Sequence, residues 1–156
     1  MSNAFVSALW GADYLLTCAN AGFAGVNLHG GGDGFYTPIA VGPRLSTEIR
    51  PLYYGMQLAN QFVGFEMYDC KIDQVSNLTA YFGRRGTQAL LALINKDPKD
   101  IVVDLPKLLH QHKVKNEMRL TGPSLNALSG TNLAEHKSSV CKSVMVPAYS
   151  AALLKW

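Results

Sequence analysis

The chain has few cysteines, and their positions exclude two kinds of site. Its 156 residues contain 3 cysteines, at positions 18, 70 and 141, an odd number with no CxxC pair. A disulfide framework needs paired cysteines, and a structural zinc site needs ligands at close, regular spacing. We therefore predict no disulfide framework and no metal site. Cys18 lies in an apolar run of helical period, which is typical of a small core residue.

Charge is also sparse. Charged residues make up 16% of the chain and hydrophobic residues 48%, with a net charge of +3 and a pI near 8.8. This composition is typical of a folded globular protein. The lysines and arginines form no stripe, so we predict no nucleic-acid partner. Residues 4–26 are fairly apolar, but no basic residue precedes them and Asp13 interrupts them. We predict neither a signal peptide nor a membrane helix there.

The motifs that hold phosphates are missing as well. Neither GxGxxG nor GxxxxGK[ST] occurs, and Pro38 prevents a helix from starting directly after the glycine-rich loop near residue 31. We predict no nucleotide and no other cofactor. His110 and His112 form an HxH pair in an expected loop and His136 stands alone, so a structural or solvent-exposed role is favoured for all three.

The acidic residues do not form a catalytic set. Glycoside hydrolysis needs two carboxylates at a fixed separation. Glu66 and Glu117 fall in expected strands, Glu135 in an expected polar loop, and Asp33 between glycines, where a turn role is favoured. Glu48 follows the same loop, and no GxSxG motif is present. The chain is therefore expected to contain no catalytic residue.

The hydrophobic period changes near residue 64. Before it, apolar residues recur at helical spacing over 3–21 and 51–63, and an apolar run at 24–29 favours a buried parallel strand. After it, alternating or continuous apolar stretches predict antiparallel strands at 78–83, 88–95, 101–105, 116–120 and 142–156, with turns at 83–86 and 95–100. The expected fold class is mainly β: an antiparallel β-sandwich, preceded by a helix, a strand and a helix.

One stretch carries an unusual density of glycine. GVNLHGGGDGFYTPI, residues 25–39, contains five glycines, and the aromatic pair Phe35-Tyr36 follows the last of them. Glycine lets a backbone approach a ligand closely, and loops at strand ends often carry binding residues. The alternative is a plain glycine turn.

Several segments resemble glycoside hydrolase family 79, which holds β-glucuronidases and heparanases. The most specific are SALWGADYLLTCANAGFAGVNLHGGGDGFYTPIA (7–40) and RPLYYGMQLANQF (50–62), followed by LLALINKD, VDLP, RLTGPSL and VPAYSAALL. The resemblance implies that residues 1–63 are the last part of a (β/α)8 barrel and residues 64–156 a β-sandwich domain. It also implies that both catalytic glutamates belong to earlier barrel strands, so that the chain alone is inactive.

The same resemblance assigns the glycine loop a role. Gly34-Phe35-Tyr36 matches a Gly-x-Tyr element that holds the carboxylate of a uronic acid through a backbone amide and a phenol, and His29 lies beside it. The implied partner is a uronic-acid-containing glycan. Bare strand edges in residues 1–63 are expected to promote self-association.

A second hypothesis is a non-catalytic β-sandwich that binds carbohydrate or only supports another domain. Carbohydrate binding would need an exposed aromatic platform, for which Tyr68, Tyr81, Tyr149 and Trp156 are the candidates.

Overall fold

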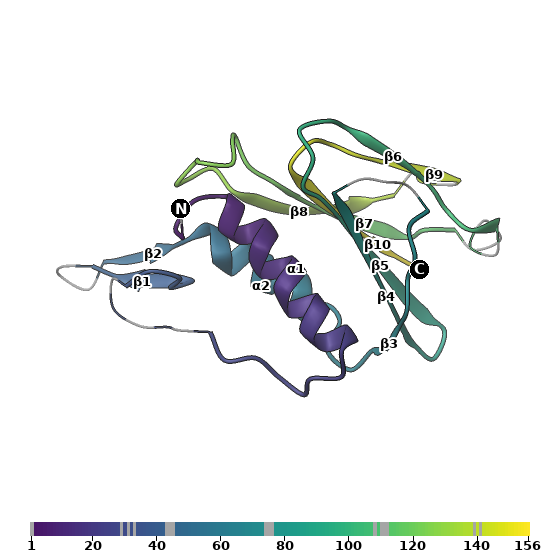
Figure 1. Cartoon of the computed structure of the whole chain (residues 1–156), viewed down its shortest axis with the longest axis horizontal. Helices are drawn as coiled ribbons and strands as arrows, with labels where there is room; N and C mark the ends of the chain where they lie inside the picture. Colours follow the sequence, from purple (N-terminus) through teal and green to yellow (C-terminus); the bar gives the residue numbers. More distant parts are fainter. Residues whose placement is uncertain are drawn as a thin grey trace.

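The computed structural model describes residues 2–28, 30, 32, 34–42, 46–73, 77–107, 109, 113–138, 140 and 142–156. Its elements form layers (Figure 1). Helices α1 (Val6–Asn20) and α2 (Pro51–Asn60) pack against one face of a six-stranded antiparallel sheet. A two-stranded sheet covers the opposite face. A short hairpin of β1 (Ile39–Val41) and β2 (Thr47–Ile49) lies beside the helices, away from the large sheet.

The strand order of the large sheet is β3-β4-β5-β10-β7-β8. These strands are β3 (Glu66–Tyr68), β4 (Leu78–Arg85), β5 (Gln88–Asn95), β7 (Asn116–Thr121), β8 (Asn132–Lys137) and β10 (Ser150–Lys155). The smaller sheet pairs β6 (Ile101–Asp104) with β9 (Ser143–Val146). Strand β10 comes last in the sequence and yet lies in the middle of the sheet, between β5 and β7.

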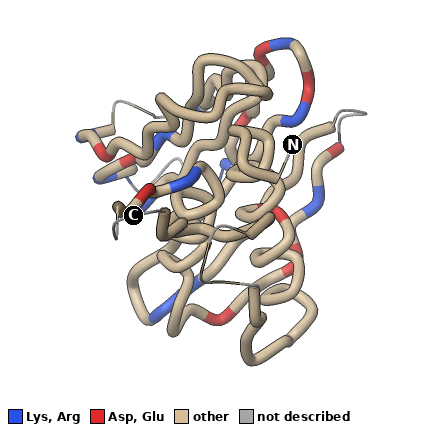
Figure 2. The backbone as a smooth tube through the Cα atoms, turned by 90° about the vertical axis from the view of Figure 1, so that its left-hand side faces the viewer, with Lys and Arg blue, Asp and Glu red and all other residues tan. Residues whose placement is uncertain are grey.

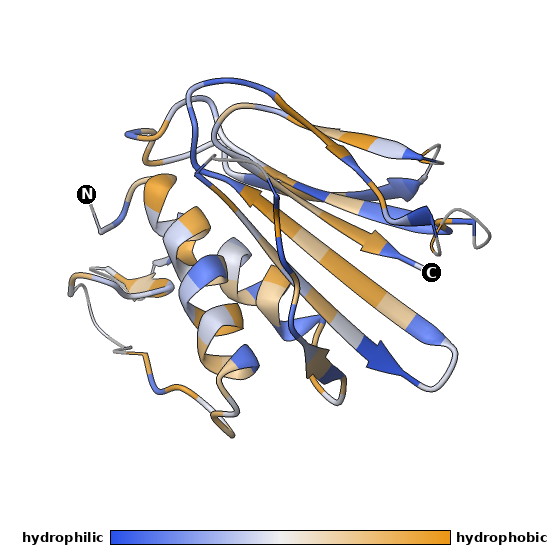
Figure 3. Ribbon diagram, turned by 45° about the vertical axis from the view of Figure 1, so that its right-hand side comes forward, coloured by the Kyte–Doolittle hydropathy of each residue, from blue (hydrophilic) through white to orange (hydrophobic). Residues whose placement is uncertain are grey.

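Strand β5 contributes side chains to two hydrophobic clusters, one on each face of the large sheet. Leu90, Ala92 and Ile94 face the helices, in a cluster that includes Phe5 and Leu16. Leu91 and Leu93 point the other way, toward Val144 and Val146 of β9. Successive residues of a strand point to opposite faces, so a strand buried on both faces is apolar throughout. Figure 3 shows this apolar colour along the central strands. The expected mainly β fold with an antiparallel sandwich and two preceding helices is confirmed.

The strand expected at 24–29 is not present in its described part. Residues 24–28 are coil, and Ala24, Gly25 and Asn27 are exposed. A buried strand needs a neighbour to pair its backbone groups, and none of the described residues pairs with this segment. The segment instead runs as coil from the end of α1 back toward β1 (Figure 1).

Other boundaries also differ from the prediction. The stretch 142–156 is two strands in different sheets, because Pro147 interrupts it and Tyr149 adopts a positive φ of 47°. Strand β4 continues through Arg85, so the turn lies at Gly86 and Thr87 instead of 83–86. Glu135 lies in β8 and not in a loop, because this mostly exposed edge strand has no apolar alternation to mark it.

The helices are shorter than predicted, and the start of α1 is bonded to the connection between β7 and β8. Asn3 does not cap α1; the backbone N–H groups of Phe5 and Val6 donate to the carbonyls of Ala127 and Leu125, at 2.8 and 2.9 Å. Pro51 occupies the first turn of α2 as expected, since that position needs no amide. The helices touch closely at Gly55, where an added Cβ would lie 2.1 Å from the carbonyl oxygen of Ala8.

Candidate functional site

The glycine loop presents an unbonded tyrosine. Tyr36 has a φ of 59°, an uncommon conformation for a non-glycine residue, and its side chain is 52% exposed. Within the described part of the chain, its hydroxyl makes no hydrogen bond, and neither do the backbone N–H groups of Gly34, Phe35 and Tyr36. The described residues 34–36 therefore offer hydrogen-bond donors to a ligand.

The opposite side of this loop is bonded to the protein. The carbonyl oxygen of Gly34 accepts hydrogen bonds from Thr37 Oγ1 at 3.0 Å and from Arg50 Nη1 at 2.8 Å. The Arg50 backbone N–H donates to the Pro38 carbonyl at 2.9 Å. Thr37 and Arg50 are both buried. The Gly34 carbonyl thus faces buried side chains of the protein.

Aromatic rings from α1 border the loop. The centroid of Trp10 lies 5.8 Å from that of Tyr36, with the planes tilted by 55°. Trp10 also stacks on Tyr14, with centroids 5.2 Å apart and an interplanar angle of 7°. All three rings are partly exposed. The prediction from sequence missed Trp10 and Tyr14; the signal was their four-residue spacing, which places them on one side of a helix.

The other predicted residues that the structure describes do not gather at this loop. His29, Asp33, His110 and His112 lie outside the described residues. Glu66 accepts a hydrogen bond from Tyr68 at 2.8 Å, Glu117 pairs with Arg119 at 3.1 Å, and Glu135 pairs with Lys155 at 2.9 Å. The hydrogen bond from Lys155 lowers the pKa of Glu135. Each of these glutamates contacts its own neighbours on the sheet, and none pairs with another carboxylate.

Metal binding, nucleic-acid binding and membrane spanning find no support in the described residues. They contain no group of three or more His, Cys, Asp or Glu side chains arranged to hold a metal ion. Their basic residues are spread over separate segments (Figure 2). Neither helix is long and apolar enough to cross a membrane. Cys18 is half-buried and Cys70 is exposed, both as free thiols.

The sandwich does not present the aromatic platform that the second hypothesis requires. Tyr81 and Trp156 are buried and Tyr149 is half-buried, whereas Tyr68 is 43% exposed. The Tyr68 ring is 6.2 Å from that of Phe82, which is itself part of the hydrophobic packing. A single exposed ring gives little surface for a sugar, so the aromatic surface of the molecule lies on α1 and the glycine loop instead.

A polar network joins α1 to the sheet. Asp13 accepts hydrogen bonds from Thr79 and from Tyr81 Oη, the latter at 2.7 Å, and its other oxygen binds Lys96 Nζ at 2.8 Å. Burial alone would raise the pKa of Asp13, but the hydrogen bonds and the charge of Lys96 together lower it below the usual 3.8. Burial, with the neighbouring carboxylate, raises the pKa of Tyr81 to about 12. This network holds the helix layer on the sheet.

We expect the Asp13 network to make stability depend on acid. A carboxyl whose pKa is lower when folded stabilises the fold above its unfolded pKa and loses that contribution as the pH falls. Asp13→Asn should therefore lower the free energy of unfolding by about 1–2 kcal/mol at pH 7 and by less at pH 3. Urea unfolding at both pH values measures this difference. The exposed Asp73→Asn is the control, and an equal cost of Asp13→Asn at both pH values contradicts the prediction.

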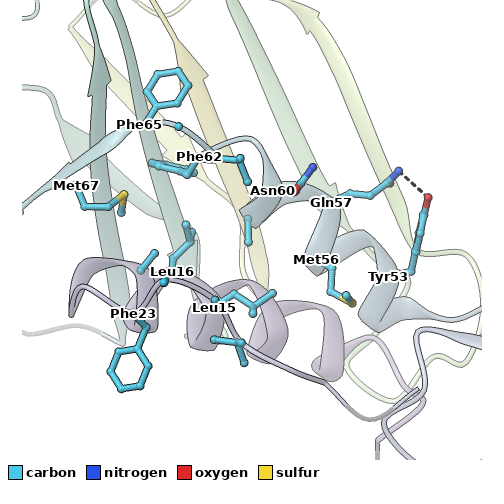
Figure 4. A pocket seen from close by; sticks show the side chains of 17 residues that line it. Leu15, Leu16, Phe23, Tyr53, Met56, Gln57, Asn60, Phe62, Phe65 and Met67 are labelled. Carbon is cyan, nitrogen blue, oxygen red and sulfur yellow. Dashed lines mark hydrogen bonds between the residues drawn. The ribbon is translucent and has the colours of Figure 1, made fainter. Parts of the chain in front are cut away.

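A groove of about 740 Å³ runs between α1, α2 and the coil that follows α1. Its lining is mainly apolar and includes Leu15, Phe23, Met56 and Met67, as Figure 4 shows. A hydrogen bond of 3.2 Å between Gln57 and Tyr53 closes one side. None of the described residues that line the groove is acidic or basic, which is typical of a packing surface more than of a catalytic cleft.

The fold matches part of several solved glycoside hydrolases. A family 51 α-L-arabinofuranosidase from Bifidobacterium longum superposes with a TM-score of 0.71 and 10% identity, covering 100% of this chain and 34% of that one. The α-L-arabinofuranosidase from Thermotoga maritima, in an arabinose complex, gives 0.68 and 10%, covering 100% and 39%. The catalytic domain of GH30 xylanase C from Talaromyces cellulolyticus gives 0.66 and 8%, covering 99% and 36%.

These matches establish the architecture. The matched structures are barrel-plus-β-sandwich proteins, and this chain spans well under half the length of each. No protein-family model matches the sequence, and no curated protein matches it. At 8–10% identity the likeness concerns the fold and not the substrate.

Proposed function

We propose that this chain forms the sugar-carboxylate-binding part and the supporting sandwich of a family 79 retaining glycoside hydrolase of the β-glucuronidase type. Residues 1–63 would complete a (β/α)8 barrel, and residues 64–156 would be the sandwich domain. The substrate would be a uronic-acid-containing glycan, and both catalytic glutamates would come from barrel strands outside this sequence. The fold of solved glycoside hydrolases and the family 79 motifs support this proposal.

The observation that carries the proposal is the loop at Tyr36. Its phenol and the amides of residues 34–36 make no hydrogen bond to any described residue, and the Gly34 carbonyl in the same loop is bonded to a buried arginine. A carboxylate has several acceptor sites and is held well by converging N–H and O–H donors. Glycine at 34 keeps that side of the loop clear of side chains.

The apolar groove between the helices is consistent with the same role. Apolar surface of this size is normally covered, and an incomplete barrel would present such a surface to its neighbouring strands and helices. We propose that the groove packs against the rest of the barrel. A chain without that neighbour would self-associate through the groove.

Tyr36→Phe tests the role of the loop. The variant is made in an active family 79 β-glucuronidase whose C-terminal part is replaced by residues 1–156, and aryl glucuronide and aryl glucoside are compared. A hydrogen bond to a charged group contributes about 1.5–3 kcal/mol, so kcat/KM for the glucuronide should fall about ten- to hundredfold. The value for the glucoside should hardly change, because that sugar has no carboxylate.

The isolated chain is assayed beside the chimera and should hydrolyse neither substrate. An equal loss on both sugars would mean that Tyr36 only shapes the pocket. No loss on either would mean that the loop is a plain glycine turn.

A further inference from the structure

The guanidinium of Arg50 lies beneath the glycine loop. Arg50 is 6% exposed, although it stands directly before α2. A buried charge is unfavourable unless strong polar contacts compensate for it. The contact with Glu48 is long, at 3.9 Å, and that carboxylate is largely exposed. The hydrogen bond to the Gly34 carbonyl is much shorter, at 2.8 Å.

This arginine and Thr37 determine the direction of one peptide group. Both donate to the Gly34 carbonyl, and a carbonyl fixed toward the interior leaves the following N–H, on Phe35, pointing outward. Two residues later, Tyr36 adopts its left-handed φ of 59°. A non-glycine residue in that region persists when the surrounding structure holds it there. Arg50 bonds the loop on both sides of Tyr36, through Gly34 and through Pro38.

The result is a defined position for the phenol. The ring of Tyr36 lies against Trp10, which comes from α1, whereas Arg50 comes from the start of α2. Two elements that are far apart in the sequence thus fix one side chain of the loop.

We propose that Arg50 is a positioning residue for Tyr36: its guanidinium holds the loop in the conformation that turns the Tyr36 phenol and the loop amides toward an anionic sugar. The inference rests on the proposed function for its ligand, but the conformation of the loop can be tested without one.

The first experiment uses the full chain and needs no sugar. We expect the nuclear Overhauser contacts between the rings of Trp10 and Tyr36 to be strong in the wild type, lost in Arg50→Met and partly kept in Arg50→Lys. Thr37→Val should weaken them less. Arg84→Met is the matched control, because Arg84 also donates to a glycine carbonyl, that of Gly86, but at the exposed β4–β5 turn. Unchanged amide shifts in β5 and β10 show that each variant is folded.

The second experiment measures selectivity in the family 79 chimera. Arg50→Met should reduce the preference for glucuronide over glucoside at least about tenfold, because the displaced Tyr36 phenol no longer donates its charge-assisted hydrogen bond to the sugar carboxylate. Arg50→Lys should restore part of the preference, and Arg84→Met should leave it unchanged. Ring contacts that persist in Arg50→Met overturn the proposal. So does a lost contact with unchanged selectivity, provided that Tyr36→Phe does change the selectivity.

Failure of the proposed function has a different signature. If Tyr36→Phe leaves the sugar preference unchanged, the loop does not bind the carboxylate, and the ring contacts alone then decide whether Arg50 positions Tyr36.

Discussion

Leu93→Asp should destabilise the chain by on the order of 3 kcal/mol or more, because it places an unpaired carboxylate in the core. Leu93 is 1% exposed in β5, where it pairs with Ala80 on one side and Ala152 on the other. Its side chain lies in the cluster between the two sheets, with Val144 and Val146. No described basic side chain belongs to that cluster.

Urea unfolding followed by circular dichroism measures the effect. The control is Val102→Asp, in which the same charge is added to a strand position that is 56% exposed on β6. Its cost should be within about 0.5 kcal/mol of zero, as for other surface substitutions. A Leu93→Asp variant that unfolds at the same urea concentration as the wild type would show that the sheet packing is different from that described.

Gly55→Leu should separate the two helices, at a cost of roughly 3 kcal/mol. Any Cβ at position 55 would meet the carbonyl oxygen of Ala8 at 2.1 Å, and this atom belongs to the backbone of α1. A backbone cannot turn aside as a side chain can, so the whole helix must move. Leucine is a better helix former than glycine, so helix propensity does not cause the loss.

Gln57→Leu provides the comparison for this variant. It adds the same side chain to the same helix, at an exposed position beside the apolar groove. Its stability should equal or exceed that of the wild type. If Gly55→Leu is as stable as Gln57→Leu, the close approach of α1 and α2 is not required for the fold.

Much of this fold could be predicted from the sequence, because the strongest patterns come from residues buried on both sides. QALLALIN has that character and became the central strand β5, with Leu90, Leu91, Leu93 and Ile94 all buried. The helix that contains Leu9, Ala12 and Leu16 was likewise marked by a repeated apolar face. An element buried on one face shows a periodic apolar pattern, and a strand buried on both faces shows a continuous one.

Short or exposed strands could not be predicted, because such strands have no apolar pattern imposed by burial. Strand β8 is mostly exposed, so its sequence NLAEHK has no apolar period, and β1, β2 and β3 are only three residues long. The apolar run at 24–28 was misleading, since a strand also depends on a neighbour that a local pattern cannot reveal.

For the candidate site, too, local motifs could be read from the sequence but contacts between distant residues could not. The family resemblance suggested Gly34 and Tyr36 as site residues from local motifs. It did not identify Arg50, because the hydrogen bond from Arg50 to Gly34 joins residues sixteen positions apart in the sequence. Nor did it identify Trp10, whose ring contacts Tyr36 across an even longer separation.

The central position of β10 has a consequence for how the chain folds. Strand β5 can pair with β4 through a short turn, but its other edge remains open until residues 150–155 arrive, and β7 has no neighbour on that side either. The pairing that completes the sheet therefore joins segments about sixty residues apart. Topologies dominated by such distant contacts fold slowly, on a timescale of roughly milliseconds to seconds. During that interval two apolar strand edges are exposed, and aggregation competes with folding.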